Sequence, residues 1–158
     1  MFDDLKNKIE KARQEKVDKE LLKAVHDYIE NKLNGNNNDA VSKRIVKVIA
    51  NGANVNAIEN DVDDESILMY LCEHDAFEII YLLAESGKLE LDQTDRLGRT
   101  ASMYAVFSKA PNSLRVLKQL GADFGKIDHC NKSVYDYCKK SMNEIRKILE
   151  KQEENQQV

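Results

Sequence analysis

The sequence predicts an all-α solenoid in which helix-turn-helix units stack side by side, with short hairpin loops between units and helical caps at the ends. Two recurring patterns in the 158 residues support this prediction. Apolar strings ending in glycine recur with spacings of 35 and 34 residues, at Gly52, Gly87 and Gly121. Strings that begin with a hydroxyl residue recur with spacings of 34 and 33, at Ser66, Thr100 and Ser133. Because a fixed period of this length is typical of repeat architectures, we expect stacked units.

Each unit is expected to contain two short helices. The strings before the glycines carry apolar residues at i, i+1, i+3 and i+4, which is the pattern of an amphipathic helix, as in Ile79-Ile80-Tyr81-Leu82-Leu83. The glycines follow these helices and fit C-terminal caps, which require a left-handed backbone. Pro111 fits the first residue of a second helix, where its missing N–H does no harm.

Helical caps are predicted at both ends of the chain. Residues 1–33 form an N-terminal helical cap of two helices or one bent helix, because two runs of helical spacing are separated by a break near Gln14 and Glu15. The first run is Phe2, Leu5, Ile9 and Ala12. The run Asn34-Gly35-Asn36-Asn37-Asn38 predicts a loop, with Asp39 as the N-cap of a helix through Ala50. A capping helix is expected around Ile145, Ile148 and Leu149, and residues 153–158 are expected to be a mobile tail.

The repeated strings resemble the ankyrin repeat family, whose period is about 33 residues and whose first helix opens with T-P-L-H-x-A. Residues 95–100, DRLGRT, are similar to the family's turn into the first helix, and residues 52–56, GANVN, to its exit from the second. The resemblance covers roughly residues 39–152. It implies one ankyrin-repeat domain over residues 1–152, with repeats at 39–57, 58–92, 93–125 and 126–152.

One part of the family pattern is missing from this chain. In the family, the histidine of the motif and the threonine hydroxyl form a hydrogen-bonded clip across each loop. Here Met69, Met103 and Asp136 stand at the histidine position. The resemblance therefore implies repeats that are looser than usual.

Composition and charge exclude several classes of function. The net charge is -4, yet residues 61–95 hold 11 acidic side chains and one basic one, whereas residues 96–126 hold one acidic and six basic. The acidic block disfavours nucleic-acid binding. No apolar run is long enough for a membrane span, and the charged start does not fit a signal peptide, so we expect a cytoplasmic protein without membrane contact. Three cysteines without a C-x-x-C motif agree with a reducing compartment.

No catalytic residue, metal site or cofactor is expected. The chain lacks phosphate-binding, dinucleotide-binding, metalloprotease and serine-hydrolase motifs, and its three histidines fall in different units. His129 and Cys130 are adjacent, but neighbouring residues on a hairpin point apart, which disfavours a thiolate–imidazole pair. Cys72 and Cys138 are expected to be buried, inert thiols, too far apart to form a disulfide.

Tyr70, Tyr104 and Tyr137 are the first candidates for partner binding, because each lies four residues after the hydroxyl that opens its string. The resemblance implies that this position lies on the first helix, toward the concave side of the stack. The three rings then form either a ladder along the groove or part of the framework between repeats. Tyrosine is enriched at interaction hot spots, which supports the first alternative.

The hairpin tips are the second candidate surface. Asp61, Asp63 and Asp64 precede a predicted helix, where they either complement the helix dipole or help to recruit a basic partner. Their spacing does not match that of a calcium loop. Arg96 and His129 belong to the tips of the next two hairpins.

The sequence therefore predicts a monomeric, non-enzymatic scaffold or adaptor that binds a protein partner through the concave groove and the hairpin tips. The acidic hairpin favours a partner with a basic surface. One alternative is an assembly protein that associates with itself through the amphipathic N-terminal helices, using Phe2, Leu5 and Ile9. A second alternative is an enzyme without a recognisable motif.

Overall fold

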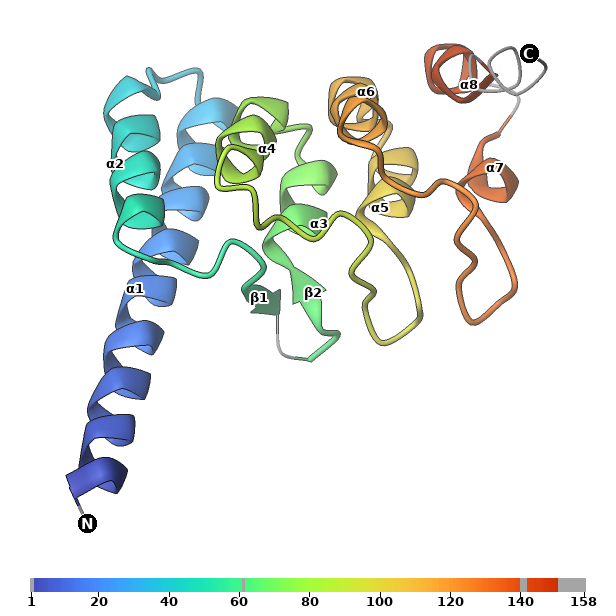
Figure 1. The fold of residues 1–158 in the computed structure, drawn as a ribbon. Coiled ribbons are helices and arrows are strands. Elements are labelled where there is room, and N and C mark those ends of the chain that lie inside the picture. Colours follow the sequence, from blue (N-terminus) through green and yellow to red (C-terminus); the bar gives the residue numbers. More distant parts are fainter. Residues whose placement is uncertain (1, 61, 140–141, 151–158) are drawn as a thin grey trace.

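The computed structural model describes residues 2–60, 62–139 and 142–150, and it confirms the predicted all-α solenoid (Figure 1). Its helices are arranged in pairs that stand side by side, and the hairpin loops project on one side of the stack. The helices are α1 (Phe2–Leu33), α2 (Asp39–Ala50), α3 (Ile67–Glu73), α4 (Phe77–Ala84), α5 (Ala101–Phe107), α6 (Pro111–Leu120), α7 (Val134–Tyr137) and α8 (Asn143–Glu150).

The core is continuous along the stack because helices pack within their own pair and against the next pair. α1 packs on α2 within the first pair. Between pairs, α2 packs on α4, α4 on α6 and α6 on α8, while α3 packs on α5 and α5 on α7. The core residues Leu21, Ile45, Ile79, Leu114 and Leu117 are fully buried, and Ile145, Ile148 and Leu149 of α8 close the far end. Helices of seven to ten residues are too short to be stable alone, so this mutual burial holds them.

The glycines that set the repeat period adopt the left-handed backbone expected after a helix. Gly52, Gly87 and Gly121 have φ values of 92°, 67° and 92°, in the left-handed region that glycine adopts at little cost. Gly121 is the C-cap of α6, and Pro111 is the first residue of the same helix, as predicted.

Polar side chains hold the loops that follow the second helices: the first of these loops is joined to α1, and each later one to the loop before it. In each link, a side-chain oxygen accepts a hydrogen bond from a backbone N–H more than 30 residues further on. The three links are Asp18 to Asn54 at 2.7 Å, Asn56 to Glu90 at 2.8 Å and Asp92 to Asp123 at 3.0 Å. The links satisfy backbone donors that would otherwise lack a partner in the protein.

The hairpin loops contain short antiparallel pairings that the sequence did not predict. Strands β1 (Ile58–Asn60) and β2 (Glu65–Ser66) pair in the first hairpin, and one isolated bridge joins Thr94 to Thr100 in the second. Successive hairpins also contact each other through the backbone. Arg96 N donates to the carbonyl of Asp63, and His129 N donates to the carbonyl of Leu97, both at 2.9 Å. The hairpins are thus held in a row.

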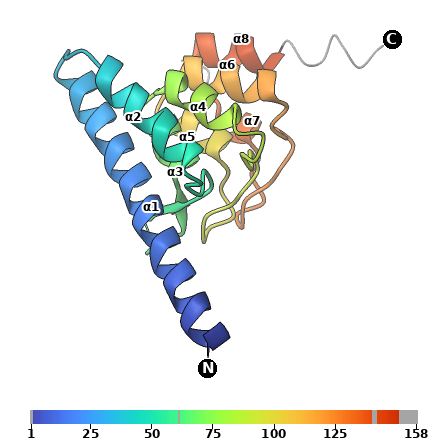
Figure 2. The ribbon, with the colours of Figure 1, turned by 60° about the vertical axis from the view of Figure 1, so that its left-hand side comes forward.

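α1 is a single continuous helix, so of the two predicted alternatives the division into two helices is wrong. It extends well beyond the other helices at its N-terminal end (Figures 1 and 2). Residues 3–16 are exposed, whereas Leu21, Ala24 and Val25 are fully buried. The break in apolar spacing near Gln14 and Glu15 therefore marks a change of helix face and not the end of a helix.

One smaller expectation, the N-cap of α2, is wrong. The N-cap is Asn38, and Asp39 is already helical. The Asn37 side chain accepts a hydrogen bond from Asp39 N at 2.7 Å. The predicted mobile tail, residues 153–158, lies outside the described residues.

Leu117 provides a test of the stacked core. It is fully buried on α6, so we expect Leu117→Ala to destabilise the protein by about 2–5 kcal/mol through lost burial and a residual cavity. Urea unfolding followed by helical circular dichroism measures this change. A loss below about 1 kcal/mol would contradict the placement of Leu117 in the shared core.

Candidate protein-interaction surface

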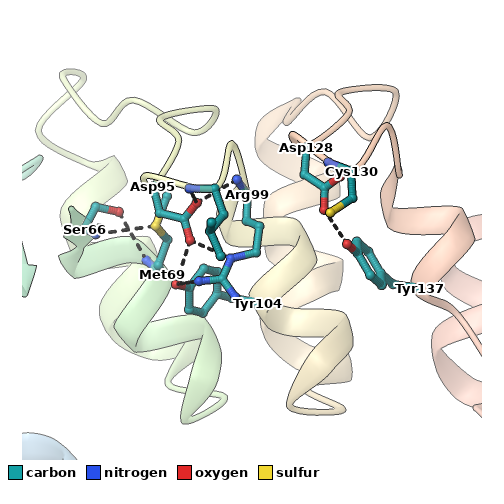
Figure 3. A network of polar contacts seen from close by, with 9 residues as sticks. Ser66, Met69, Asp95, Arg99, Tyr104, Asp128, Cys130 and Tyr137 are labelled. Carbon is teal, nitrogen blue, oxygen red and sulfur yellow. Dashed lines mark hydrogen bonds and ion pairs between the residues drawn. The ribbon is translucent and has the colours of Figure 1, made fainter. Parts of the chain in front are cut away.

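Tyr104 belongs to the framework of the stack. Its ring is only 9% exposed, and its hydroxyl donates a hydrogen bond to Oδ2 of Asp95 at 3.0 Å (Figure 3). Arg99 completes the arrangement, because its Nε lies 2.6 Å from the same Asp95 oxygen and its Nη2 lies 3.1 Å from the Tyr104 hydroxyl. Burial and the bond to Asp95 raise the pKa of Tyr104 well above its ordinary value. The structure thus places Tyr104 in the framework and not in an open groove.

The Asp95 carboxylate also organises its own hairpin. Asp95 is only 5% exposed. Its Oδ1 accepts hydrogen bonds from the backbone N–H groups of Leu97 and Arg99, both at 2.8 Å. The buried charge is stabilised by these bonds together with the Arg99 guanidinium. Asp95 therefore joins the hairpin backbone to helix α5 through Tyr104.

The next repeat contains the same arrangement. The Tyr137 hydroxyl donates to Oδ2 of Asp128, and Asp128 Oδ1 accepts from the backbone N–H groups of Cys130 and Lys132 at 2.8 and 3.0 Å (Figure 3). These bonds lower the pKa of Asp128, and the bond to Asp128 raises the pKa of Tyr137 to about 12. We call each such pair an Asp–Tyr clasp: Asp95 with Tyr104, and Asp128 with Tyr137.

The clasps were not predicted, although the sequence contains their signal. The two aspartates are 33 residues apart, the two tyrosines are 33 residues apart, and each tyrosine follows its aspartate by nine residues. The clasps join hairpin to helix in the repeats that contain Tyr104 and Tyr137. At the clip positions, Ser133 Oγ donates to Oδ2 of Asp136 at 2.7 Å, and Ser66 Oγ accepts from Met69 N at 3.4 Å. The expectation of looser repeats stays a prediction.

Tyr70 lies in different surroundings from the other two tyrosines. Its half-buried ring stacks on His26 of α1, with ring centroids 4.9 Å apart, and meets the edge of His74 at 4.7 Å. His26 Nε2 lies 2.9 Å from Oε1 of Glu59 in β1. Burial, followed by the charge of Glu59, raises the pKa of Tyr70. The first candidate residue is thus surrounded by titratable side chains from three elements.

Three carboxylates gather near Tyr70: Glu59, Glu65 and Glu73. Burial is the largest cause that raises the pKa of Glu65 from its ordinary 4.5 to about 7, followed by the charges of Glu73 and Glu59. Oε1 of Glu65 is buried and has no hydrogen-bond partner among the residues that the structure describes. We call Tyr70, Glu59, Glu65 and Glu73 the acidic cluster. It combines an aromatic ring with negative charge that is incompletely neutralised.

The hairpin tips hold the remaining candidates, and two of them pair with each other. Nε of Arg96 lies 2.8 Å from Oδ2 of Asp64, and both side chains are about half exposed. Asp63 and His129 are exposed, while Asp61 lies outside the described residues. Because Arg96 of the second hairpin pairs with Asp64 of the first, the hairpin tips together carry less negative charge than the acidic segment alone.

Apolar side chains are exposed on the same row of hairpins. Val62 is 70% exposed, Leu97 54% and Ile127 56%. On the helices, Phe107 is 40% exposed and its ring meets the edge of Tyr137 at 4.5 Å. Each of three successive hairpins thus presents one exposed apolar side chain.

Comparison with protein families agrees with this geometry. Residues 34–128 match the family model for ankyrin repeats in three copies. The chain belongs to the ankyrin repeat family. A search of curated proteins gave no match. Ankyrin repeat domains are generally protein-binding modules, and no enzyme family was detected for this chain.

The cysteines of this ankyrin repeat protein occupy three different environments. Cys72 is fully buried, and burial raises the pKa of its thiol, as expected for an inert side chain. Cys138 is only half-buried, so the prediction of burial is wrong for it, while Cys130 is exposed. Among the described residues, no group of three or more potential ligand side chains is arranged to hold a metal ion. No helix in that part of the chain is both long and apolar enough to cross a bilayer.

The framework role of Tyr104 leads to a stability prediction. We expect Tyr104→Phe to cost about 1–2 kcal/mol, because a buried carboxylate loses one of its donors. Tyr104→Ala should cost about 3–5 kcal/mol, since it also removes a buried ring. The control is Tyr81→Phe on α4, where the Tyr81 hydroxyl donates to Oε1 of Gln119 at 2.5 Å on the exposed surface. Because Gln119 can bond to water instead, the expected change is within about 0.5 kcal/mol. Equal effects of the two Tyr→Phe substitutions in urea unfolding would contradict the clasp.

The raised pKa of Glu65 leads to a pH dependence. The folded state holds the Glu65 proton more tightly than the unfolded state, so ionisation of Glu65 lowers stability as the pH rises from about 4.5 through about 7. Glu65→Gln removes this penalty and should therefore gain stability relative to wild type at pH 8, but much less at pH 5. Urea unfolding at both pH values measures the difference.

Glu85→Gln is the control for the pH experiment, because Glu85 is exposed at the end of α4. Its difference from wild type should stay nearly constant between pH 5 and pH 8. If Glu65→Gln behaved in the same way as Glu85→Gln, the carboxylates of the acidic cluster would not repel one another as the structure implies.

Proposed function

We propose that this ankyrin repeat protein is a monomeric, non-enzymatic scaffold that binds the basic segment of a protein partner at the acidic cluster and along the hairpin tips. The observation that carries the proposal is the crowding of Glu59, Glu65 and Glu73 around Tyr70. A lysine or arginine from a partner would offset the repulsion between these carboxylates and gain favourable contacts with them.

The stack supports binding because it presents a preformed surface. The clasps and the backbone bonds between hairpins fix the loops relative to the helices, which reduces the entropy lost on binding. Val62 and Leu97 supply exposed apolar area on the hairpins that follow one another in the row. A partner would thus meet negative charge on the acidic cluster and apolar contacts at the tips.

The test begins with cross-linking of the full chain in its native cell and identification of the captured proteins. Binding of each captured protein is then measured with a variant in which Glu59, Glu65 and Glu73 are all replaced by glutamine. The matched control replaces three exposed glutamates elsewhere, Glu30, Glu85 and Glu90, and has the same net charge.

We expect the first variant to bind at least tenfold more weakly than the control variant, with most of the difference lost at high salt. Tyr70→Ala should also weaken binding, whereas Tyr81→Ala on the outer helix α4 should not. Equal affinities of the two triple variants for every captured protein would refute binding at the acidic cluster.

A further inference from the structure

The N-terminal half of α1 carries an apolar seam that does not contact the stack. Leu5 is 56% exposed and Ile9 is 61% exposed. With Phe2 and Ala12, they follow the spacing of three, four and three residues that is typical of two packed helices. Residues 3–16 are all exposed along this helix. We call residues 2–13 the overhang.

The C-terminal end of the overhang is marked by the first contacts between α1 and the stack. Gln14 Nε2 donates a hydrogen bond to the Gly52 carbonyl at 3.0 Å, and Asp18 accepts from Asn54 N at 2.7 Å. The seam is not an extension of the buried face of α1. At about 100° per residue, Leu5 and Ile9 lie ~160° and ~120° around the helix from Leu21, which is fully buried. The seam therefore points away from the core that the same helix helps to form.

Charges beside the seam disfavour pairing of the overhang with a second copy. The positions that flank the seam on its two sides hold Lys6, Lys8 and Arg13, with Glu15 further along. Lys8 Nζ lies 2.7 Å from Oδ2 of Asp4 on the same helix, an exposed ion pair that contributes little. In a parallel pair, Lys8 would face Arg13 of the other copy. In an antiparallel pair with Leu5 opposite Ile9, Lys6 would face Lys6 and Lys8 would face Lys8. Both arrangements place like charges opposite each other.

The same side of α1 continues into a hollow with further basic residues. The hollow is shallow, with a volume of about 440 Å³, and is lined by Ala12, Glu15, Lys16, Lys19, Glu20 and Lys23. A small side chain at Ala12 leaves room for a large apolar residue of a partner. The lining contains three lysines and two glutamates, so the hollow adds little net charge to the basic flank of the seam.

A membrane surface fits these observations less well than a partner helix. Residues 3–16 contain four acidic and five basic side chains, so the overhang as a whole has little net charge to attract anionic lipid. The seam is also narrow, with one apolar residue per turn, whereas interfacial helices insert a broad apolar face. A packed helix, in contrast, contacts only the seam and its flanks.

We propose that the overhang is a second docking site, which pairs with an amphipathic partner helix whose apolar seam is flanked by aspartate and glutamate. Leu5 and Ile9 pack against the apolar seam of the partner, while Lys6, Lys8 and Arg13 face its carboxylates. This site differs from the acidic cluster in position and in the sign of its charge. Evidence against one of the two sites would therefore not count against the other.

The probe is a designed 21-residue helical peptide with leucine and isoleucine along its seam and glutamate at the flanking positions. A second peptide is identical except for lysine at those positions. Binding of each labelled peptide to the full chain is measured by fluorescence anisotropy. We expect the glutamate peptide to bind at least tenfold more tightly than the lysine peptide, and this preference should shrink as salt is raised.

Variants of the protein separate the seam from the flanks. Leu5→Gln with Ile9→Gln should weaken binding of the glutamate peptide at least tenfold while leaving the circular dichroism melt of the stack unchanged. Replacing Lys6, Lys8 and Arg13 by glutamate should reverse the preference between the two peptides. The matched control replaces Lys11, Lys43 and Lys88, which are exposed and lie off the seam, and should retain the wild-type preference.

Three results would overturn the proposal. One is equal binding of the two peptides by the wild-type chain. Another is a dimer in analytical ultracentrifugation that the Leu5 and Ile9 substitutions abolish, because it would make a second copy the occupant. The last is stronger binding to phosphatidylserine vesicles than to the glutamate peptide, lost in the same variant, because it would make the seam a membrane contact.

Discussion

Each helix pair of this ankyrin repeat protein can bury its apolar faces only against its neighbours, and this constraint determines the rest of the structure. α3 and α4 bury Ile67, Met69 and Ile79 between the pairs on either side. The connecting loops cannot enter this core, because their backbone groups would lose hydrogen bonds, so they project together on one side. The surfaces left for other molecules are the hairpin row, the inner helices and the ends of the stack.

The Asp–Tyr clasp shows how a divergent sequence keeps the geometry of the repeat. A buried carboxylate is costly unless it is paired and hydrogen-bonded, and Asp95 meets this requirement with two backbone N–H groups, Arg99 and Tyr104. The clasp assigns Tyr104 and Tyr137 to the framework. Tyr70 stands at the same place in its own repeat, yet its ring packs on His26 and His74. One sequence position therefore has two different roles.

The parts of the fold that depend on local chemistry could be predicted from the sequence. Gly121 and Pro111 mark helix ends because their backbone preferences are strong wherever they occur. The role of Tyr104 could not be decided from its spacing, since a ring at that position can face either the groove or Asp95. The choice between two helices and one bent helix over residues 1–33 stayed open for a similar reason. A shift in apolar spacing near Gln14 is equally consistent with a helix end or with a change of face, and the uninterrupted helical backbone from Phe2 to Leu33 decides for the change of face.

Stacking of the repeats brings acidic and basic segments of the chain next to each other. The acidic segment and the basic segment that follows it lie in adjacent repeats, where Asp64 and Arg96 partly neutralise each other. The unbalanced negative charge then gathers around Tyr70, where His26 of α1 meets Glu59. Arg13 of the overhang is 13 residues before His26, which corresponds to ~20 Å along the helix. That distance is more than twice the Debye length of ~8 Å at physiological salt, so the basic flank and the acidic cluster hardly influence each other. A basic ligand and an acidic one can therefore be recognised on the same stack, each by local contacts.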